Sequence, residues 1–303
     1  MDSKPMKNKL LLITFIMILL LFGCSAKKQS VAENTPGNIP VDIHRIISTA
    51  PSNTEIIADL GMAHKLVAID RHSVNIKAQE GLPEIPGGIP LLDFFFPDAE
   101  VIVNLNPDLI LASGHNPTGT GEDPFRVLSE MGIPVVYISM STSIEEIYSD
   151  IALIAELLGA KEQGKILITS MKAKINEITT PQFTGSTPGI YFEISAAPEM
   201  MTFGNGNFIH DMIEILGGQN IFEDEHWLVM PSAEAVIERN PEIIFTNVNY
   251  IDNPIAEIKS RPGFENITAV RNNRIYRIDA DSSVRASARI VLALQQMAEA
   301  INE

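Results

Sequence analysis

The sequence predicts an α/β protein made of two lobes, each built on a parallel sheet, that are joined by a single long α-helix. Short apolar strands alternate with helical segments along most of the chain, which is typical of a parallel sheet covered by helices. A helical stretch at 160–178 has no glycine after Gly164 and would span roughly 27 Å, enough to link two lobes. An Asn-Pro motif recurs at the same distance from a glutamate, which indicates that the two lobes are similar.

The chain opens with the features of a bacterial lipoprotein signal peptide. Three lysines precede an apolar run at 10–22 and polar residues follow it, so we expect residues 1–23 to be a cleaved leader and not a spanning helix. Cys24, the only cysteine, lies where a diacylglycerol would be attached, and a chance cysteine after an ordinary signal is the alternative. Residues 24–41 are polar and contain two prolines, which predicts a flexible tether on the outer face of the cytoplasmic membrane.

The composition argues against several classes of protein. Loss of three lysines and one aspartate with the leader takes the net charge from −16 to about −18, which disfavours a nucleic-acid partner. A single cysteine allows no intramolecular disulfide, so burial of the 45% apolar residues must stabilise the fold. The sequence contains no phosphate loop, nucleophile elbow, His-Glu-x-x-His pair or cysteine cluster, so we expect no enzyme activity and no resident cofactor.

The N-terminal lobe is predicted over residues 42–158. Ser52 and Glu55 have the spacing of a capping box, which predicts a helix that begins there and ends before Gly61. Short apolar runs predict strands at 46–48, 65–69, 109–112 and 134–138.

The linking helix is expected within 159–182, after a helix that a second capping box, Ser143 and Glu146, begins. The C-terminal lobe is then predicted over 183–303. Its first strand is expected at 190–194, where an apolar run follows a loop rich in proline and glycine.

The internal repeat places Glu100 and Glu234 at equivalent positions. Each lies seven residues before the proline of an Asn-Pro pair, and each repeat reads as a helix, its Asn-Pro end and a buried strand. The two helices are expected to be capped by Asp98 and Ser232. A glutamate in the first turn complements the helix dipole, which is one sufficient reason for its presence.

Aromatic residues in predicted loops are candidates to bind a ligand. Phe94, Phe95 and Phe96 are consecutive and cannot all face one core, so at least one is expected to point outward. Trp227, the only tryptophan, lies in a loop before a helix and is a candidate platform for a ligand. Packing in the core is the alternative for these aromatic residues.

Three histidines, His72, His115 and His226, lie just past predicted strand ends or in loops, where ligand crevices form in parallel sheets. A hydrogen-bonded surface histidine is the alternative for each. Together they could also converge on a zinc ion.

The last helix is expected to begin with Arg285 and Arg289, downstream of Asp281. A cation is unfavourable at the start of a helix because the helix dipole is positive there. We therefore expect Arg285 to be retained by an ion pair or by a ligand.

Four segments of the sequence carry the pattern of one protein family. They are Ile46-Ile47-Ser48-Thr49-Ala50-Pro51-Ser52-Asn53-Thr54-Glu55, Asn106-Pro107-Asp108-Leu109-Ile110, Gly217-Gly218-Gln219-Asn220-Ile221-Phe222 and Arg261-Pro262-Gly263-Phe264. Through these segments the chain from about Arg45 to the C terminus resembles the periplasmic-binding-protein family of ABC importers for cobalamin, haem and ferric siderophores. The resemblance implies two α/β lobes joined by one long helix, the class III architecture, with the ligand between the lobes.

By position, the resemblance implies that Glu100 and Glu234 dock onto arginines of the transporter permease. The segment 281–290 is most similar to the cobalamin-binding members, in which the residues that match Asp281 and Arg285 face the ligand. The candidate ligand contacts are His72, Phe94, Phe95, His115, Asn116, Met201, Trp227, Asp281 and Arg285.

These observations predict a lipid-anchored monomer that binds a bulky metal chelate, with cobalamin or another corrinoid as the leading ligand, and delivers it to an ABC permease dimer. A ferric siderophore or haem is the alternative ligand. A zinc- or manganese-binding lipoprotein that uses His72, His115 and His226 is the alternative from another class. The stiff linking helix predicts small lobe motions and not wide hinge closure.

Overall fold

The computed structural model describes residues 39–302, apart from 41, 78–82, 115–122 and 180–186. The predicted leader, Cys24 and all but the end of the predicted tether lie outside the described residues. The chain divides after Glu33 into two compact units, and every described residue belongs to the second. Within the described part, none of the helices combines the length and the apolar character needed to cross a bilayer.

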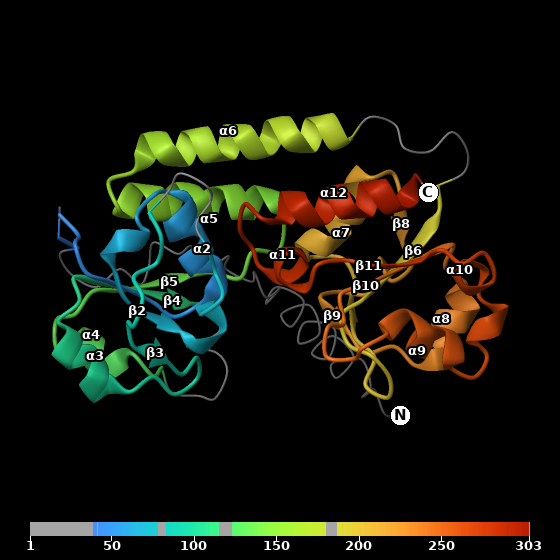
Figure 1. The fold of residues 1–303 in the computed structure, drawn as a ribbon, viewed down its shortest axis with the longest axis horizontal. Coiled ribbons are helices and arrows are strands. Elements are labelled where there is room, and N and C mark those ends of the chain that lie inside the picture. The colour runs from blue at the N-terminus through green and yellow to red at the C-terminus, as the bar shows by residue number, and fades with distance from the viewer. Residues whose placement is uncertain (1–38, 41, 78–82, 115–122, 180–186, 303) are drawn as a thin grey trace, which may run out of the picture. The chain divides into compact units, whose positions relative to one another are not determined.

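The N-terminal lobe contains a five-stranded parallel sheet in the order β3-β2-β1-β4-β5 (Figure 1). Its elements are β1 (Ile46–Ser48), α2 (Pro51–Asp59), η2 (Ala63–Lys65), β2 (Leu66–Asp70), η3 (Arg71–Ser73), β3 (Leu91–Leu92), α3 (Ala99–Leu105), β4 (Leu109–Ser113), α4 (Arg126–Glu130), β5 (Val135–Ile138) and α5 (Ile144–Leu157).

The C-terminal lobe follows α6 (Lys161–Ile178) and contains a four-stranded parallel sheet in the order β11-β10-β6-β8, with a two-stranded antiparallel ribbon of β7 and β9. Its elements are β6 (Gly189–Glu193), β7 (Thr202–Phe203), α7 (Phe208–Ile215), β8 (Gln219–Asn220), β9 (Leu228–Val229), α8 (Ala233–Arg239), β10 (Ile243–Thr246), α9 (Pro254–Ser260), η4 (Phe264–Asn266), α10 (Thr268–Arg271), β11 (Ile275–Arg277), α11 (Ala280–Val284) and α12 (Ile290–Ile301). The α/β fold class with two parallel sheets is the predicted one, and the predicted strands differ from the observed ones by at most one residue at either end.

The start of α2 differs from the prediction. Ala50 is the N-cap and makes no side-chain hydrogen bond, and Pro51 occupies the first turn, so Ser52 and Glu55 do not form a capping box. Proline is well suited to this position because its ring presets a helical φ and its missing N–H has no intrahelical partner there. Glu55 is therefore free of a local capping role, and its side chain is wholly buried.

The capping box at the start of α5 is present with one change. Ser143 Oγ accepts a hydrogen bond from the Glu146 amide at 3.2 Å, as expected. The Glu146 carboxylate, however, accepts from the amide and hydroxyl of Thr142, both at 2.7 Å, one residue before the cap. Both interactions stabilise the backbone between β5 and the start of α5.

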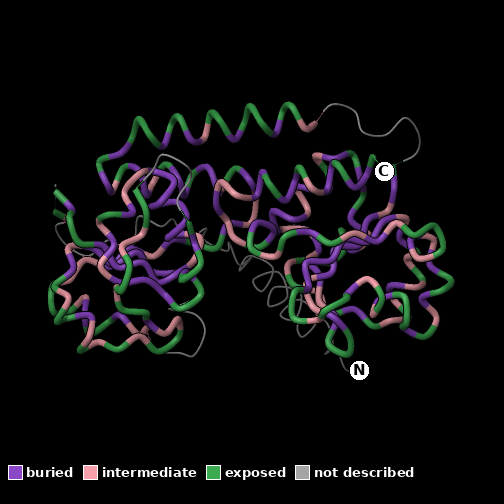
Figure 2. The backbone as a smooth tube through the Cα atoms, viewed as in Figure 1, coloured by how far each residue is buried: buried purple, intermediate pink, exposed green. Residues whose placement is uncertain are grey.

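Helix α6 coincides almost completely with the segment 160–178, where the linking helix was predicted. Its buried positions recur every three or four residues, so one stripe of the helix packs against α5 and α12 while the rest is exposed (Figures 1 and 2). At Gly164 an added Cβ would lie 2.5 Å from the Ala155 Cβ, so glycine permits the close approach of α6 to α5. The buried residues are Gly164, Leu167, Met171 and Ile175.

The predicted last helix is in fact two helices. Arg285 is the C-cap of α11 and Arg289 is the N-cap of α12, so neither lies inside a first turn. The prediction was wrong because the helical periodicity of the sequence does not reveal the break at 285–289, which begins with the extended residue Arg285.

One apolar cluster runs through both lobes. It contains Ile46 on β1, Met171 on α6 and Phe192 on β6, together with residues of α2, α5, α7 and α12. Strand residues that point the other way, such as Ile47 and Tyr191, belong to separate clusters on the opposite faces of the two sheets. The two lobes therefore share one core and each has a second core of its own.

The internal repeat is present in detail. Asp98 accepts hydrogen bonds from the amides of Glu100 and Val101 at the start of α3, and Ser232 accepts from the Ala235 amide at the start of α8, so both predicted caps are confirmed. Both helices end at an asparagine in the left-handed region, with φ of 44° in each case. Asparagine tolerates this conformation, which explains the recurrent Asn-Pro pair.

Candidate functional site

A cavity of about 520 Å³ lies between residues of the two lobes. The N-terminal lobe contributes the start of α2, the end of β4 and the segment that follows β5. The carboxyl ends of parallel strands are where ligands bind in open α/β sheets. The C-terminal lobe contributes residues near β7, α7 and β9 and the segment 281–286. The cavity has the size of a small-molecule pocket.

Aromatic side chains from both lobes line this cavity. Phe94 lies on the N-terminal side, with the Phe95 ring edge-on at 4.8 Å between centroids. Trp227 lies on the C-terminal side, edge-on to Phe203 at 5.5 Å. Phe95 is itself 57% exposed and, like Met201, is not among the lining residues.

The backbone of Trp227 is held in an uncommon conformation. Its φ of 61° is left-handed, which is costly for a bulky side chain and persists only where the surroundings enforce it. The Trp227 amide donates to the Asn205 carbonyl and its carbonyl accepts from the Gly204 amide, both at 2.8 Å. A Cβ on Gly204 would lie 2.2 Å from the Glu225 carbonyl oxygen, so only glycine allows this pairing. The Gly-Asn-Gly turn therefore positions the tryptophan.

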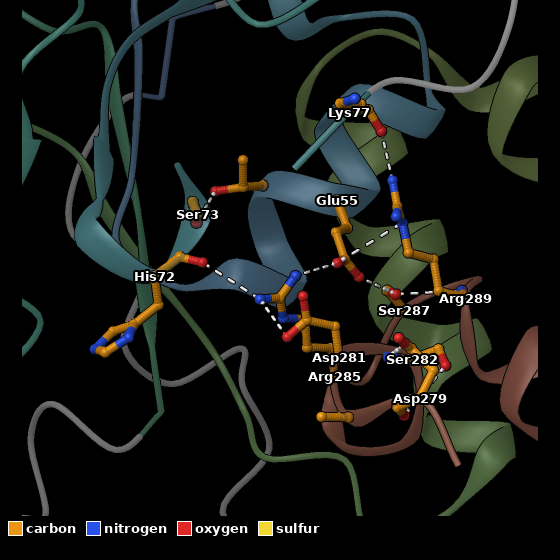
Figure 3. Close-up of polar contacts among 12 residues, drawn as sticks. Glu55, His72, Ser73, Lys77, Asp279, Asp281, Ser282, Arg285, Ser287 and Arg289 are labelled. Atoms are coloured by element: carbon orange, nitrogen blue, oxygen red, sulfur yellow. Dashed lines mark hydrogen bonds and ion pairs between the residues drawn. The ribbon is translucent and has the colours of Figure 1, made fainter. Parts of the chain in front are cut away.

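A buried carboxylate joins the two lobes at the edge of the cavity (Figure 3). Glu55, on α2, accepts hydrogen bonds from Arg285 Nη1 at 2.7 Å and from Ser287 Oγ at 2.5 Å, and Arg289 Nε lies 3.7 Å away. We call these four residues the Glu55 network. Burial raises the pKa of Glu55, while the hydrogen bonds from Ser287 and Arg285 oppose that rise.

The rest of the Arg285 guanidinium is also engaged. Arg285 Nη2 pairs with Asp281 Oδ1 at 2.8 Å and donates to the His72 carbonyl at 3.3 Å, and the Arg289 guanidinium donates to the Lys77 carbonyl (Figure 3). The ion pair expected for Arg285 is thus present. Arg285, Asp281 and His72 all line the cavity, so these contacts connect the cavity wall directly to the junction of the lobes.

Buried polar side chains also line the cavity, and sequence reasoning missed them. Ser141 Oγ donates to Asp150 Oδ2 at 2.6 Å, and both side chains are almost inaccessible. Burial raises the pKa of Asp150 to about 6, and the nearby Glu146 adds to the rise. Asp150 lies in the middle of a helix, where an isolated acidic residue usually faces solvent. Asn53, Ser113 and Asn207 are the other buried polar residues that line the cavity.

The three candidate histidines do not form a site in the described structure. His72 lines the cavity, whereas His226 is exposed, does not line it, and has its Nδ1 2.8 Å from Asn205 Oδ1. His115 and Asn116 lie outside the described residues. Within the ranges that the structure describes, no group of three or more His, Cys, Asp or Glu side chains could hold a metal ion.

Of the predicted ligand contacts, the structure brings five together around the cavity, namely His72, Phe94, Trp227, Asp281 and Arg285. Glu100 and Glu234 are exposed in the first turns of α3 and α8, outside the cavity.

Comparison with known proteins identifies the family. Residues 46–282 match the family described as Periplasmic binding protein. The chain belongs to this family. It is therefore a substrate-binding protein of the class III architecture and not an enzyme.

The relatives of the chain cover most of its length. The ABC transporter substrate-binding lipoprotein YvrC of Bacillus subtilis, described as uncharacterized, is 28% identical over 277 residues, which are 89% of this chain and 83% of YvrC. The vitamin B12-binding protein of Vibrio campbellii is 27% identical over 260 residues, 84% of this chain and 88% of that protein.

Among solved structures, a possible iron-binding periplasmic solute-binding protein from Staphylococcus epidermidis is similar to this chain with a TM-score of 0.76 and 30% identity. The similarity covers 86% of this chain and 100% of that one. The two-lobed fold is therefore shared over nearly all the residues described here.

Proposed function

We propose that this chain is a lipid-anchored protein that captures a bulky metal chelate, with a corrinoid such as cobalamin as the leading ligand, and delivers it to an ABC permease dimer. Attachment through Cys24 would hold it on the outer face of the cytoplasmic membrane. The observation that carries the proposal is the aromatic pair Phe94 and Trp227, which approach one cavity from opposite lobes.

A planar macrocycle suits this arrangement for a physical reason. Each of its faces presents a large apolar area, and two aromatic walls can cover that area while polar groups hold the periphery. Asp281 and His72 line the cavity with polar groups suited to amide and hydroxyl substituents. The vitamin B12-binding relatives support a corrinoid, and the iron-binding neighbour supports an iron chelate as the alternative.

A trianionic siderophore has less support from the charges around the cavity. Arg285 is the only arginine or lysine that lines it among the described residues, and that guanidinium already pairs with Glu55 and Asp281. The zinc or manganese alternative lacks support as well, since His226 lies outside the cavity lining.

The first test is a titration of the mature protein with cobalamin, cobinamide, haem, ferric siderophores and zinc. Trp227 is the only tryptophan, so its emission reports the proposed wall alone, with free tryptophan amide as the control for light absorption by the ligand. Ligand at 100 times its dissociation constant should stabilise the protein by about 2.7 kcal/mol in a thermal melt. A response to siderophore, haem or zinc alone would remove the corrinoid assignment while keeping the transport role.

Alanine substitutions should distinguish Phe94 and Trp227, the proposed aromatic walls, from a neighbouring aromatic residue that does not line the cavity. Phe94→Ala and Trp227→Ala are each expected to weaken binding of the corrinoid about tenfold or more in calorimetry, because each removes stacking area from the ligand. Phe95→Ala is the matched control, since that ring is adjacent in sequence but does not line the cavity. Equal losses for all three variants would contradict the proposed wall.

A further inference from the structure

Each lobe exposes one large apolar side chain four residues before its predicted docking glutamate. In the N-terminal lobe this is Phe96, 75% exposed, upstream of Glu100. In the C-terminal lobe it is Met230, 62% exposed, upstream of Glu234. Figure 1 shows that α3 and α8, which carry the glutamates, lie on the sides of their lobes away from α6.

The two side chains occupy the same position of the internal repeat. Residues 96–110 and 230–244 correspond one to one, with a proline, a capping residue, an alanine and the glutamate following in both. At inward positions such as Ile102 and Val236 the repeat is explained by packing, because these side chains are completely buried. Packing within the chain does not explain why the outward position is a large apolar residue in both lobes.

Both side chains are carried by ordered backbone. Asp93 Oδ1 accepts hydrogen bonds from the amides of Phe95 at 3.0 Å and Phe96 at 2.9 Å, which fixes the turn. Met230 directly follows β9, whose residues pair with β7. Preorganisation of this kind lowers the entropic cost of binding a partner.

The charges beside these residues select the kind of partner. Glu100 and Glu234 are exposed next to the apolar side chains, and hydrogen bonds from its own amide and from Ser232 lower the pKa of Glu234, which keeps it ionised. An anionic lipid surface would repel this face, and so would a second copy of a chain with net charge −16. A protein with a cation beside an apolar depression, present twice, is complementary to it.

We propose that Phe96 and Met230 are the apolar halves of two equivalent docking sites, each inserting into a depression of one permease subunit beside the cation that pairs with Glu100 or Glu234. The inference rests on the proposed function, because it takes the permease dimer as the partner. Aromatic residues and methionine are enriched at the centres of protein interfaces, where they supply most of the affinity.

The test measures the affinity of the ligand-loaded protein for the nanodisc-reconstituted permease complex. Phe96→Ala and Met230→Ala are each expected to weaken docking roughly tenfold, and Phe96→Leu should recover most of the loss. Ile166→Ala is the matched control, because this side chain is 69% exposed and belongs to α6, which lies on the opposite side of the lobes from α3 and α8 (Figure 1). Ligand affinity should not change in any of these variants.

Salt distinguishes the apolar contribution from the charged one. Screening should shrink the loss caused by Glu100→Lys as the salt concentration rises, whereas the loss caused by Phe96→Ala should persist. If the glutamate variants abolish docking and the two alanine variants do not weaken it, the inference is overturned and the docking role of the glutamates remains. If the unmodified protein does not bind the permease, the proposed transport role and the inference both fail.

Discussion

Arg285→Met is expected to lower the free energy of unfolding by about 3–5 kcal/mol at pH 8, because it leaves the carboxylate of Glu55 buried without its main cationic partner. The side chain of Glu55 is completely inaccessible and that of Arg285 is 14% exposed, so the ion pair is largely shielded from water. Urea unfolding of the variant and the unmodified protein, each without ligand, measures the difference.

The loss should depend on pH in a defined direction. Removal of the arginine raises the pKa of Glu55 in the folded state further above its unfolded value. Stability from a raised carboxyl pKa is present at low pH and is lost as the pH rises through the folded-state pKa. The destabilisation by Arg285→Met should therefore be smaller at pH 5 than at pH 8.

A double variant provides the control for this prediction. Glu55→Gln combined with Arg285→Met removes both charges, and the glutamine oxygen can still accept from Ser287. The double variant is expected to be more stable than Arg285→Met alone at pH 8. If Arg285→Met alone lowers the free energy of unfolding by less than about 1 kcal/mol, as expected for an exposed ion pair, the Glu55 network does not hold the lobes together.

Asp150→Asn is expected to stabilise the protein without ligand by about 2–3 kcal/mol above pH 7. Burial raises the pKa of Asp150 from 3.8 to about 6, so the folded state disfavours the ionised carboxylate that predominates at neutral pH. Asparagine has no charge to bury and can accept the Ser141 hydrogen bond. Thermal melts at a series of pH values measure the difference.

The sign of the Asp150 effect follows from the raised pKa. The unmodified protein should lose stability relative to the variant as the pH rises from about 4 to about 6. Below pH 4 the two proteins should be nearly equal, because Asp150 is protonated in both the folded and the unfolded state. A constant difference at all pH values would contradict the assignment, and Glu145→Gln, on an exposed position of the same helix, is the control.

The sequence was informative where the structure depends on local contacts. Strands could be located because their residues are buried on both faces, as in β4 and β10, and produce continuous apolar runs. The duplicated helices could be located because Asp98 and Ser232 cap them from within the same turn. Phe94 and Trp227 could be predicted as ligand contacts because exposed aromatic residues in loops tend to mark binding sites.

The polar part of the site depends on contacts between distant segments. Glu55 meets Arg285 across 230 positions of the chain, and a local rule assigned it to a capping box instead. Asp150 could not be recognised either, because the burial that raises its pKa depends on the packing of the folded chain, which its sequence neighbours do not reveal.

The apolar cluster shared by the two lobes limits how far they can act as separate units. The halves repeat each other in surface pattern, yet neither could bury its share of the cluster by itself, because α5, α6 and α12 complete the packing of both. A fragment that ends within α6 would leave apolar surface uncovered and should not fold autonomously. The sequence repeat thus relates two short segments, whereas the shared apolar cluster predicts that the two lobes unfold together as one cooperative unit.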